Sequence, residues 1–184
     1  MQRPQDDGRG TVEDARLVLR CQLGERAAFD ALIERWAAPI AGYARRVTQD
    51  GDAAAELAQD VWLRVFRGIG RLREPKRFRA WLFGIAHRAF ADSLRKRYAA
   101  RAIAEASELA DAPEPDHVDA ELVERGLERL PPIEREILTL FYLQELSIAE
   151  VAEALGIASG TVKSRLHRAR HQLRQELETQ GELS

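Results

Sequence analysis

Apolar residues recur at helical spacing along most of the chain, and this periodicity is the feature that most limits its possible folds. In residues 27–47, for example, apolar side chains stand at Phe29, Leu32, Ile33 and Trp36, the i, i+3, i+4, i+7 pattern of an amphipathic helix. Strand-type alternation is missing, as are Asn-Gly or Asp-Gly turns flanked by β-branched runs. The sequence therefore predicts an all-α fold.

Glycine and proline residues divide this pattern into separate helices. Thr11 is a candidate N-cap for the first helix and Gly24 is expected to end it. Pro39 is expected to bend the second helix or to mark a seam in it. The expected helices span residues 12–23, 27–47, 52–69, 78–101, 118–130, 133–143, 148–155 and 159–177.

A change in composition predicts two small helical domains joined by a flexible linker. Residues 102–117 are acidic and contain Pro113 and Pro115, which favour a semi-extended chain. One domain is then expected over residues 11–101 and a second over residues 118–184. Residues 1–10 are polar and lack the apolar run of a signal peptide, so we expect a disordered N-terminus there.

Charge is distributed unevenly along the sequence. Residues 64–101 carry a net charge of +10, whereas residues 102–129 carry −7. Residues 157–175 hold five Lys or Arg, two His and no acid. This distribution predicts two surfaces that face a polyanion, separated by an acidic segment that is kept away from them.

Several classes of protein are disfavoured by what the sequence lacks. No apolar run reaches the ~20 residues that a membrane helix needs, and the lone Cys21 excludes an internal disulfide. The motifs of P-loop enzymes, zinc proteases, CxxC proteins and serine hydrolases are missing. His167 and His171 have metal-like spacing but no evident third ligand. We therefore expect a cytoplasmic, non-enzymatic protein without a metal or cofactor.

The C-terminal part carries the pattern of a helix-turn-helix. Ser147 and Glu150 predict a capping box, Gly156 suits the end of that helix, and Ser159 is expected to cap the next one. The second helix of such a unit normally enters the DNA major groove. A basic helix alone would more often be a solvated surface, but the capped helix, tight turn and second helix together favour DNA binding. The candidate contacts are Ser159, Thr161, Lys163, Ser164, Arg165, His167, Arg168 and His171.

Three stretches occur in an informative order: AAELAQDVWLRVF at residues 54–66, FRAWLFGIAHR at 78–88, and LPPIERE through GTVKSRLHRAR at 130–170. They resemble, in order, the polymerase-clamp helix, the promoter-opening segment and the DNA-binding C-terminal domain of sigma-70 family proteins. The two-domain length is similar to that of the extracytoplasmic-function (ECF) subfamily. The resemblance implies a region 2-like domain at 11–101 and a region 4-like domain at 118–184.

The resemblance implies that the helix at 52–69 binds the coiled-coil clamp of core RNA polymerase. The candidate contacts are Glu56, Gln59, Asp60, Leu63, Arg64 and Arg67. Their i,i+4 charge pairs are also what an ordinary solvated helix face carries. Ala53 and Ala55 stand where the family often has acids, which implies either weaker core binding or more dependence on Asp50 and Asp52.

The resemblance also implies that the basic block binds the minus-ten promoter element as an opened strand. The candidate contacts are Arg71, Arg73, Lys76, Arg77, Phe78, Arg88, Arg95, Lys96 and Arg97. Phe78 is the expected stacking residue for an unstacked base, whereas Trp81 is expected in the core. Arg88 stands where the family often has Asn, so the preferred minus-ten sequence is expected to differ.

The implied partners are core RNA polymerase, promoter DNA, recognised through its minus-ten and minus-thirty-five elements, and an anti-sigma factor wedged between the domains. Two other classes remain open. A stand-alone helix-turn-helix regulator with a helical sensory or dimerisation domain explains the C-terminal part, but not the basic block at 64–101. A helical interaction protein, such as an anti-sigma antagonist, would use its basic surfaces on acidic protein partners.

Overall fold

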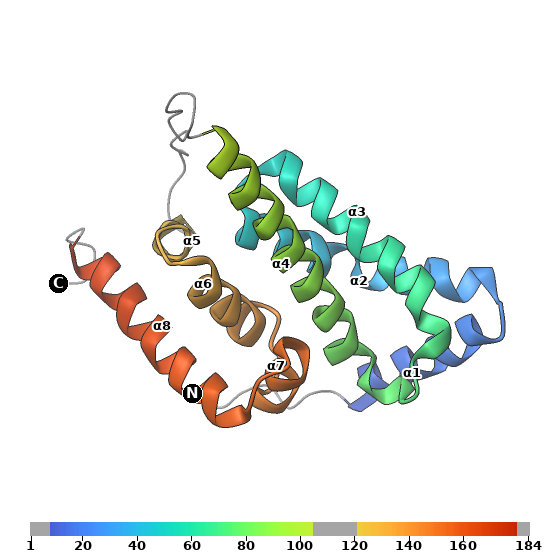
Figure 1. The fold of residues 1–184 in the computed structure, drawn as a ribbon. Helices are drawn as coiled ribbons and strands as arrows, with labels where there is room; N and C mark the ends of the chain where they lie inside the picture. Colours follow the sequence, from blue (N-terminus) through green and yellow to red (C-terminus); the bar gives the residue numbers. More distant parts are fainter. Residues whose placement is uncertain (1–7, 105–120, 180–184) are drawn as a thin grey trace.

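The structure, a computed structural model, describes residues 8–104 and 121–179. Every regular element in these two ranges is helical and none is a strand, which confirms the all-α fold (Figure 1). Gly8–Gly10, expected to be disordered, belong to the first helix, and the rest of the expected disordered N-terminus lies outside the described residues. Most of the expected linker, residues 105–117, lies outside the described residues. Its first three residues belong to the fourth helix, which continues through residue 104.

The first domain contains four α-helices and two short 3-10 turns. Both turns lie in residues 69–77, the loop that joins the third and fourth helices. The elements are α1 (Gly8–Gln22), α2 (Arg26–Thr48), α3 (Gly51–Gly68), η1 (Ile69–Arg71), η2 (Pro75–Arg77) and α4 (Phe78–Ala104). Pro39 lies inside α2, which continues as one helix on both sides of it, so no seam divides this helix.

The second domain contains the remaining helices. The expected helix at 133–143 is present as an α-helix followed by one π-helical turn, and the two helices of the helix-turn-helix follow it. The elements are α5 (Glu121–Glu128), α6 (Pro132–Leu138), η3 (Thr139–Leu143), α7 (Ile148–Leu155) and α8 (Ser159–Thr179). In Figure 1, α4 lies between α3 and this second group of helices.

Two of the predicted helix ends are confirmed and two are corrected. Ser147 and Glu150 form the expected capping box, and Gly156 ends α7 with φ +65°. Thr11, by contrast, lies inside α1 instead of capping it. Ser159 is the first residue of α8, and the first helical bond runs from the Val162 N–H to the Ala158 carbonyl at 3.1 Å. Residue 158 therefore precedes the helix at the cap position.

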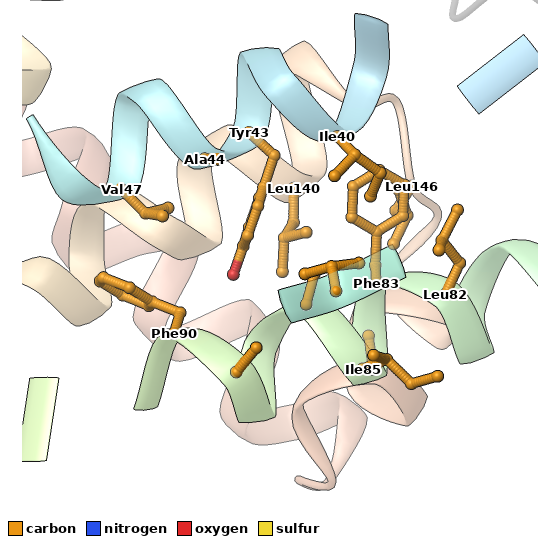
Figure 2. Packing of buried hydrophobic residues seen from close by; sticks show 14 of the residues in the cluster. Ile40, Tyr43, Ala44, Val47, Leu82, Phe83, Ile85, Phe90, Leu140 and Leu146 are labelled. Atoms are coloured by element: carbon orange, nitrogen blue, oxygen red, sulfur yellow. The ribbon is translucent and has the colours of Figure 1, made fainter. Parts of the chain in front are cut away.

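One apolar core continues through both domains. Figure 2 shows Ile40 and Tyr43 of α2 and Phe83 of α4 grouped with Leu140 and Leu146 of the second domain. All five side chains are completely buried. The Tyr43 and Phe83 rings meet edge to face, with their centroids 5.8 Å apart. Because apolar burial is the main favourable term in folding, this shared core stabilises the contact between the domains.

Helix α4 of the first domain packs closely against α7 of the second. A Cβ atom added to Gly84 of α4 would lie 3.4 Å from the backbone oxygen of Ala154 in α7. Such contact distances require small residues on both helices. Consequently α7, the first helix of the helix-turn-helix, lies directly on the segment expected to contact the minus-ten element.

Candidate functional site

The candidate core-polymerase contacts gather along a groove between α3 and α4. The groove has a volume of about 350 Å³, and five of the six predicted residues line it: Glu56, Gln59, Asp60, Leu63 and Arg64. Arg67 is exposed but lies outside the lining. Leu63 is 47% exposed, so the groove offers an apolar contact within a polar rim. This combination is typical of protein-binding surfaces.

An ion-pair network closes one side of this groove. Arg64 contacts Asp60 on its own helix at 2.8 Å, the predicted i,i+4 pair, and it donates across to Asp92 of α4 at 2.8 Å. The hydrogen bond from Arg64 lowers the pKa of the Asp92 carboxyl. Asp92 also accepts from Arg95. Arg64 therefore has a structural contact between α3 and α4, in addition to any contact with a partner.

Asp50 has a structural task that bears on the alanines at positions 53 and 55. Its side chain accepts a hydrogen bond from the Ala53 N–H at 2.8 Å and so caps α3. An N-cap aspartate stabilises a helix by satisfying a backbone donor that has no helical partner. Asp52 is exposed in the first turn of the same helix. Of these two acids, Asp52 is the one without a role in capping.

The candidate minus-ten contacts occupy η1, η2 and α4, but their surroundings differ. Arg71, Arg73, Lys76 and Arg88 are exposed. The exposed Arg95 contacts Asp92, as stated above, and Lys96 lines the α3–α4 groove beside the core-polymerase candidates. Arg97 lines a separate hollow of about 400 Å³ at the domain boundary. These cations are therefore spread over residues 69–77 and along α4, and do not form one continuous site.

Arg77 binds the second domain through its guanidinium group. It contacts Glu153 of α7 at 2.7 Å and Glu74 of its own loop at 3.1 Å. The hydrogen bond to Glu153 raises the pKa of Arg77. Two residues further on, Arg79 donates to the backbone carbonyl of Gln144. Sequence reasoning missed Glu153, because nothing in the local pattern indicates which helix packs against the loop.

Phe78 does not face solvent, and the expectation that it stacks on a base is wrong for this structure. Its ring is completely buried. It meets Trp36 edge to face at a centroid distance of 6.1 Å and lies 5.9 Å from the ring of Trp81. The helical register at the start of α4 turns this ring into the core. Trp81 is partly buried against that core, as the sequence predicted.

A second polar contact between the domains is buried at Glu136. The Tyr43 hydroxyl donates to Glu136 Oε1 at 2.6 Å, and His87 Nδ1 lies 2.9 Å from the same oxygen. Glu136 is 3% exposed, so its carboxylate depends on these partners for stabilisation. Burial and the Glu136 charge raise the pKa of Tyr43 well above its usual value. This cluster joins α2, α4 and α6.

Arg135, next to Glu136, is also buried between the domains. Its guanidinium donates to the Leu130 carbonyl at 2.8 Å and to the Val47 carbonyl at 3.3 Å, where α2 approaches its end. Burial lowers the pKa of Arg135 to about 10, so it stays protonated at neutral pH. A buried cation can persist when its donors are satisfied, here by backbone oxygens. The sequence did not distinguish this residue from a surface arginine.

The recognition helix α8 presents its basic residues to solvent. Val162, Leu166 and Ala169 form its buried side at helical spacing, and Leu173 continues this side as a partly buried residue. Lys163, Ser164, His167, Arg168 and His171 are exposed, whereas Ser159 is exposed at the helix start and Thr161 and Arg165 are partly buried. No carboxylate within the described ranges forms an ion pair with Lys163, Arg165 or Arg168.

In the described part of the chain, no helix is both long and apolar enough to cross a bilayer. No group of three or more His, Cys, Asp or Glu side chains in that part is arranged to hold a metal ion. An apolar hollow of about 300 Å³ lies beside α8 in the second domain, lined by Leu127, Leu138, Tyr142, Leu143, Arg170 and Leu173.

Two family descriptions match this chain in consecutive segments. Sigma-70 region 2 matches residues 32–100, which include α3, the loop and most of α4. Sigma-70 region 4 matches residues 120–173, which include the helix-turn-helix. Helix α1 precedes both matched segments.

Whole-chain comparisons agree with these matches. The chain is 34% identical over 168 residues to the ECF RNA polymerase sigma factor SigM of Mycobacterium tuberculosis, covering 90% of this chain and 85% of that protein. It is 30% identical over 183 residues to the RNA polymerase sigma-H factor of Pseudomonas aeruginosa, covering 90% and 94%.

Solved structures with the same arrangement include CnrH in complex with the cytosolic domain of CnrY. The TM-score is 0.71 at 26% identity, covering 91% of this chain and 98% of that one. Another is the sigma factor RpoE in complex with the anti-sigma factor NepR from Bartonella quintana. Its TM-score is also 0.71, at 25% identity, covering 82% and 96%.

Proposed function

Because this chain belongs to the sigma-70 family, as an ECF sigma factor that directs promoter-specific transcription initiation, we propose that three of its surfaces divide this task. The observation that carries the proposal is that one chain holds both family regions in order, each with exposed cations. A stand-alone regulator would require only the second of these regions. The comparisons do not favour that alternative.

The α3–α4 groove is the proposed site for core polymerase. Its support is the exposed Leu63 within a rim of Glu56, Gln59, Asp60 and Arg64, with Arg67 nearby on the same helix. A mixed-charge rim around an apolar centre suits a protein partner better than it suits DNA, whose surface is uniformly anionic. The absence of acids at positions 53 and 55 places more of the polar contact on this rim.

The loop and α4 are the proposed site for the opened minus-ten strand. Arg71, Arg73, Lys76 and Arg88 are exposed and suited to phosphates or to the planes of unstacked bases. Arg77 and Arg95 join them once DNA competes with the carboxylates that they now contact. The exposed Lys96 and Arg97 extend this proposed surface along α4. Phe78 is left out of this proposal because its ring is buried.

The exposed face of α8 is the proposed site for the minus-thirty-five element. Arg168 and Lys163 are suited to guanine edges or phosphates, and the hydroxyls and imidazoles beside them can donate or accept hydrogen bonds. The proposed contacts are Ser159, Thr161, Lys163, Ser164, Arg165, His167, Arg168 and His171. The lack of acids from residue 157 to 175 supports an anionic partner.

The contact between the domains has a consequence for promoter binding. Glu153 of α7 and a promoter phosphate compete for the same Arg77 guanidinium. Full use of the minus-ten surface therefore requires α7 to move away from η2. Catalysis is left to the polymerase inside the cell, and the sigma factor contributes binding energy that favours the opened promoter.

An anti-sigma factor is the proposed antagonist. Its support is that both solved relatives with a TM-score of 0.71 are complexes, one of them with the anti-sigma factor NepR. An antagonist wedged between the domains would have to separate α4 from α7 and break the Glu136 cluster. Purification of the native chain from its own cells tests this, and fully active chain without a bound protein would contradict it.

The decisive experiment is transcription in vitro. The purified chain is added to sigma-free core polymerase and genomic DNA fragments, and the transcript starts are mapped. Discrete starts that share two upstream elements are expected. An absence of specific starts, together with DNA binding by the chain alone, would instead favour a stand-alone regulator.

A pair of matched variants tests the core-polymerase surface. Leu63→Asp in the groove is expected to lower the affinity for core polymerase at least about tenfold, since it places a charge at the apolar contact. Leu19→Asp makes the same change at a leucine of α1 that is 52% exposed and is not part of the groove lining. Equal affinities for the two variants would contradict the proposed site.

A further inference from the structure

One side chain of α1 holds the loop that precedes α4. The Gln22 amide donates to the Ile69 carbonyl at 3.0 Å and to the Leu72 carbonyl at 2.8 Å. Gln22 is the last residue of α1, and it is some fifty positions from the loop in the sequence. Both bonds start from the same nitrogen, Nε2, so this single amide group contacts the loop at two points.

The two carbonyls lie at the two ends of η1. The turn itself is closed by the Leu72 N–H, which donates to the Ile69 carbonyl at 3.2 Å. Gly68 and Gly70 surround the start of this turn, and glycine leaves the backbone more conformations than any other residue. A three-residue turn that follows one glycine and contains another needs external contacts to keep one shape, and Gln22 supplies two.

The exposed cations of the loop lie beside these anchor points. Arg71 is the last residue of η1, and Arg73 directly follows Leu72. Ile69 is buried and Leu72 is partly buried against the core, so the backbone of residues 69–72 lies against the protein while the arginine side chains extend into solvent. The positions of both guanidinium groups therefore depend on how firmly residues 69–72 are held.

We propose that Gln22 is a positioning residue for minus-ten recognition, because it fixes the backbone from which Arg71 and Arg73 reach DNA. This inference rests on the proposed minus-ten role of the loop. It concerns a residue ahead of the segment that matches sigma-70 region 2, which begins at residue 32. Gln22 touches the loop backbone only and acts on DNA through it.

Loss of the two bonds has a specific expected consequence. The charges of Arg71 and Arg73 remain, so attraction to phosphates is retained. Base discrimination falls, because it requires side chains held in one geometry against a base edge or plane. A residue that merely stabilised the fold would instead lower binding to all promoters equally.

The test compares three substitutions in the full-length chain with core polymerase. Gln22→Met keeps the length and removes both donors, Gln22→Glu turns a carboxylate toward two carbonyl oxygens, and Gln22→Lys keeps donors within reach. The template set is the chain's own mapped promoter with each minus-ten base replaced in turn. The readout is the ratio of transcription from the preferred base to that from each other base.

Q22M and Q22E are expected to lower this ratio about five- to tenfold at one or two adjacent minus-ten positions, the size that loss of two neutral hydrogen bonds predicts. Q22K is expected to retain most of the discrimination. Responses to minus-thirty-five substitutions should stay unchanged. The matched control is Gln49→Met, which removes a hydrogen bond from the side-chain amide to the Glu128 carbonyl, away from the loop. It should leave minus-ten discrimination intact.

Cleavage by trypsin after Arg71 and Arg73 measures the loop without transcription, and Q22M is expected to be cut there several-fold faster than the wild type. Unchanged cleavage and unchanged base discrimination in Q22M would overturn the inference alone. So would an equal loss at every promoter that Q22K fails to restore, since that indicates a general structural role. A wild-type chain that directs no specific starts overturns this inference and the proposed function together.

Discussion

The two basic surfaces of this protein differ in the pairing of their candidate DNA contacts. On the first domain, Arg77 contacts Glu74 and Glu153, and Arg95 contacts Asp92. On the second domain, Arg168 is exposed and no carboxylate in the described ranges pairs with it. The net charge of +10 over residues 64–101 already counts Glu74 and Asp92, but Glu153 of the second domain lies outside that range and lowers the positive charge that a DNA strand would meet at Arg77.

The contrast implies two different binding costs. A phosphate that approaches Arg168 displaces only water and counterions, and counterion release favours binding. A phosphate that approaches Arg77 must also replace the Glu153 carboxylate and move α7. Tertiary packing can therefore pair the cations of one basic segment with carboxylates while it leaves those of another exposed to solvent, even when the two segments have similar compositions.

The largest expected effect comes from reversing a charge on the open surface. Arg168→Glu should lower the affinity for a duplex containing the minus-thirty-five element about 100-fold, because it removes a favourable contact and adds repulsion. Fluorescence anisotropy at fixed salt measures this. Arg174→Glu, the same change further along α8 at a residue that pairs with Glu178, is the control and should cost only a few-fold. Equal losses would mean that α8 attracts DNA without orienting it.

The next effect concerns the buried contact that keeps the domains together. Glu136→Gln should lower the free energy of unfolding by about 2 kcal/mol, since hydrogen bonds to a buried charged acceptor are stronger than neutral ones. Urea denaturation measures the change. Glu134→Gln in the first turn of α6 is the matched control, with an expected change under about 0.5 kcal/mol. If both variants unfold alike, the Glu136 cluster does not stabilise the contact between the domains.

A smaller effect tests whether α7 masks the loop. Glu153→Gln should raise the affinity of the full chain for a single-stranded minus-ten oligonucleotide about threefold, because it frees Arg77 from the second domain. Glu74→Gln changes the net charge equally but leaves the contact with α7 intact. The two variants therefore separate masking from charge. Identical gains in affinity would indicate that charge alone is responsible.

The smallest effect concerns the ion pair between Arg64 of α3 and Asp92 of α4. Arg64 lowers the pKa of Asp92 below its usual 3.8. The ion pair therefore contributes stability above pH 3.8 and loses it as the pH falls through the lowered pKa. Asp92→Asn should cost at most about 0.5 kcal/mol at neutral pH, because the pair is partly exposed. Urea unfolding at several pH values checks this, with the exposed Asp30→Asn as the control. A difference that persists in acid would rule out the ionic explanation.

Local features of the chain were predictable because their causes lie within a few residues. The capping box at Ser147 and Glu150 and the buried stripe of α8 follow from short-range hydrogen bonding and helical periodicity. The exposed candidates on α8 were predictable for the same reason, since the opposite side of a known buried stripe faces solvent. The errors at Thr11 and Ser159 are shifts of helix ends by a few residues, where several start signals compete.

Contacts between distant segments were not predictable in this way. Phe78 was assigned to DNA because it borders a basic loop, yet the packing of α4 against α2 buries its ring beside Trp36. Nothing near Glu153 in the sequence indicates that Arg77 is its partner, 76 residues away. The same holds for Gln22, whose amide looks like any polar helix end until the loop lies next to it.

By itself, the sequence determined the helical class, the order of the two family regions and the exposed basic face of the recognition helix. Only the tertiary structure decided which cations are paired, which aromatic ring is buried and how the first domain's loop is held. The physical reason is the range of the interactions. Helical periodicity and capping act within one or two turns, whereas burial and ion pairing depend on which surfaces meet, and one local pattern fits many such meetings.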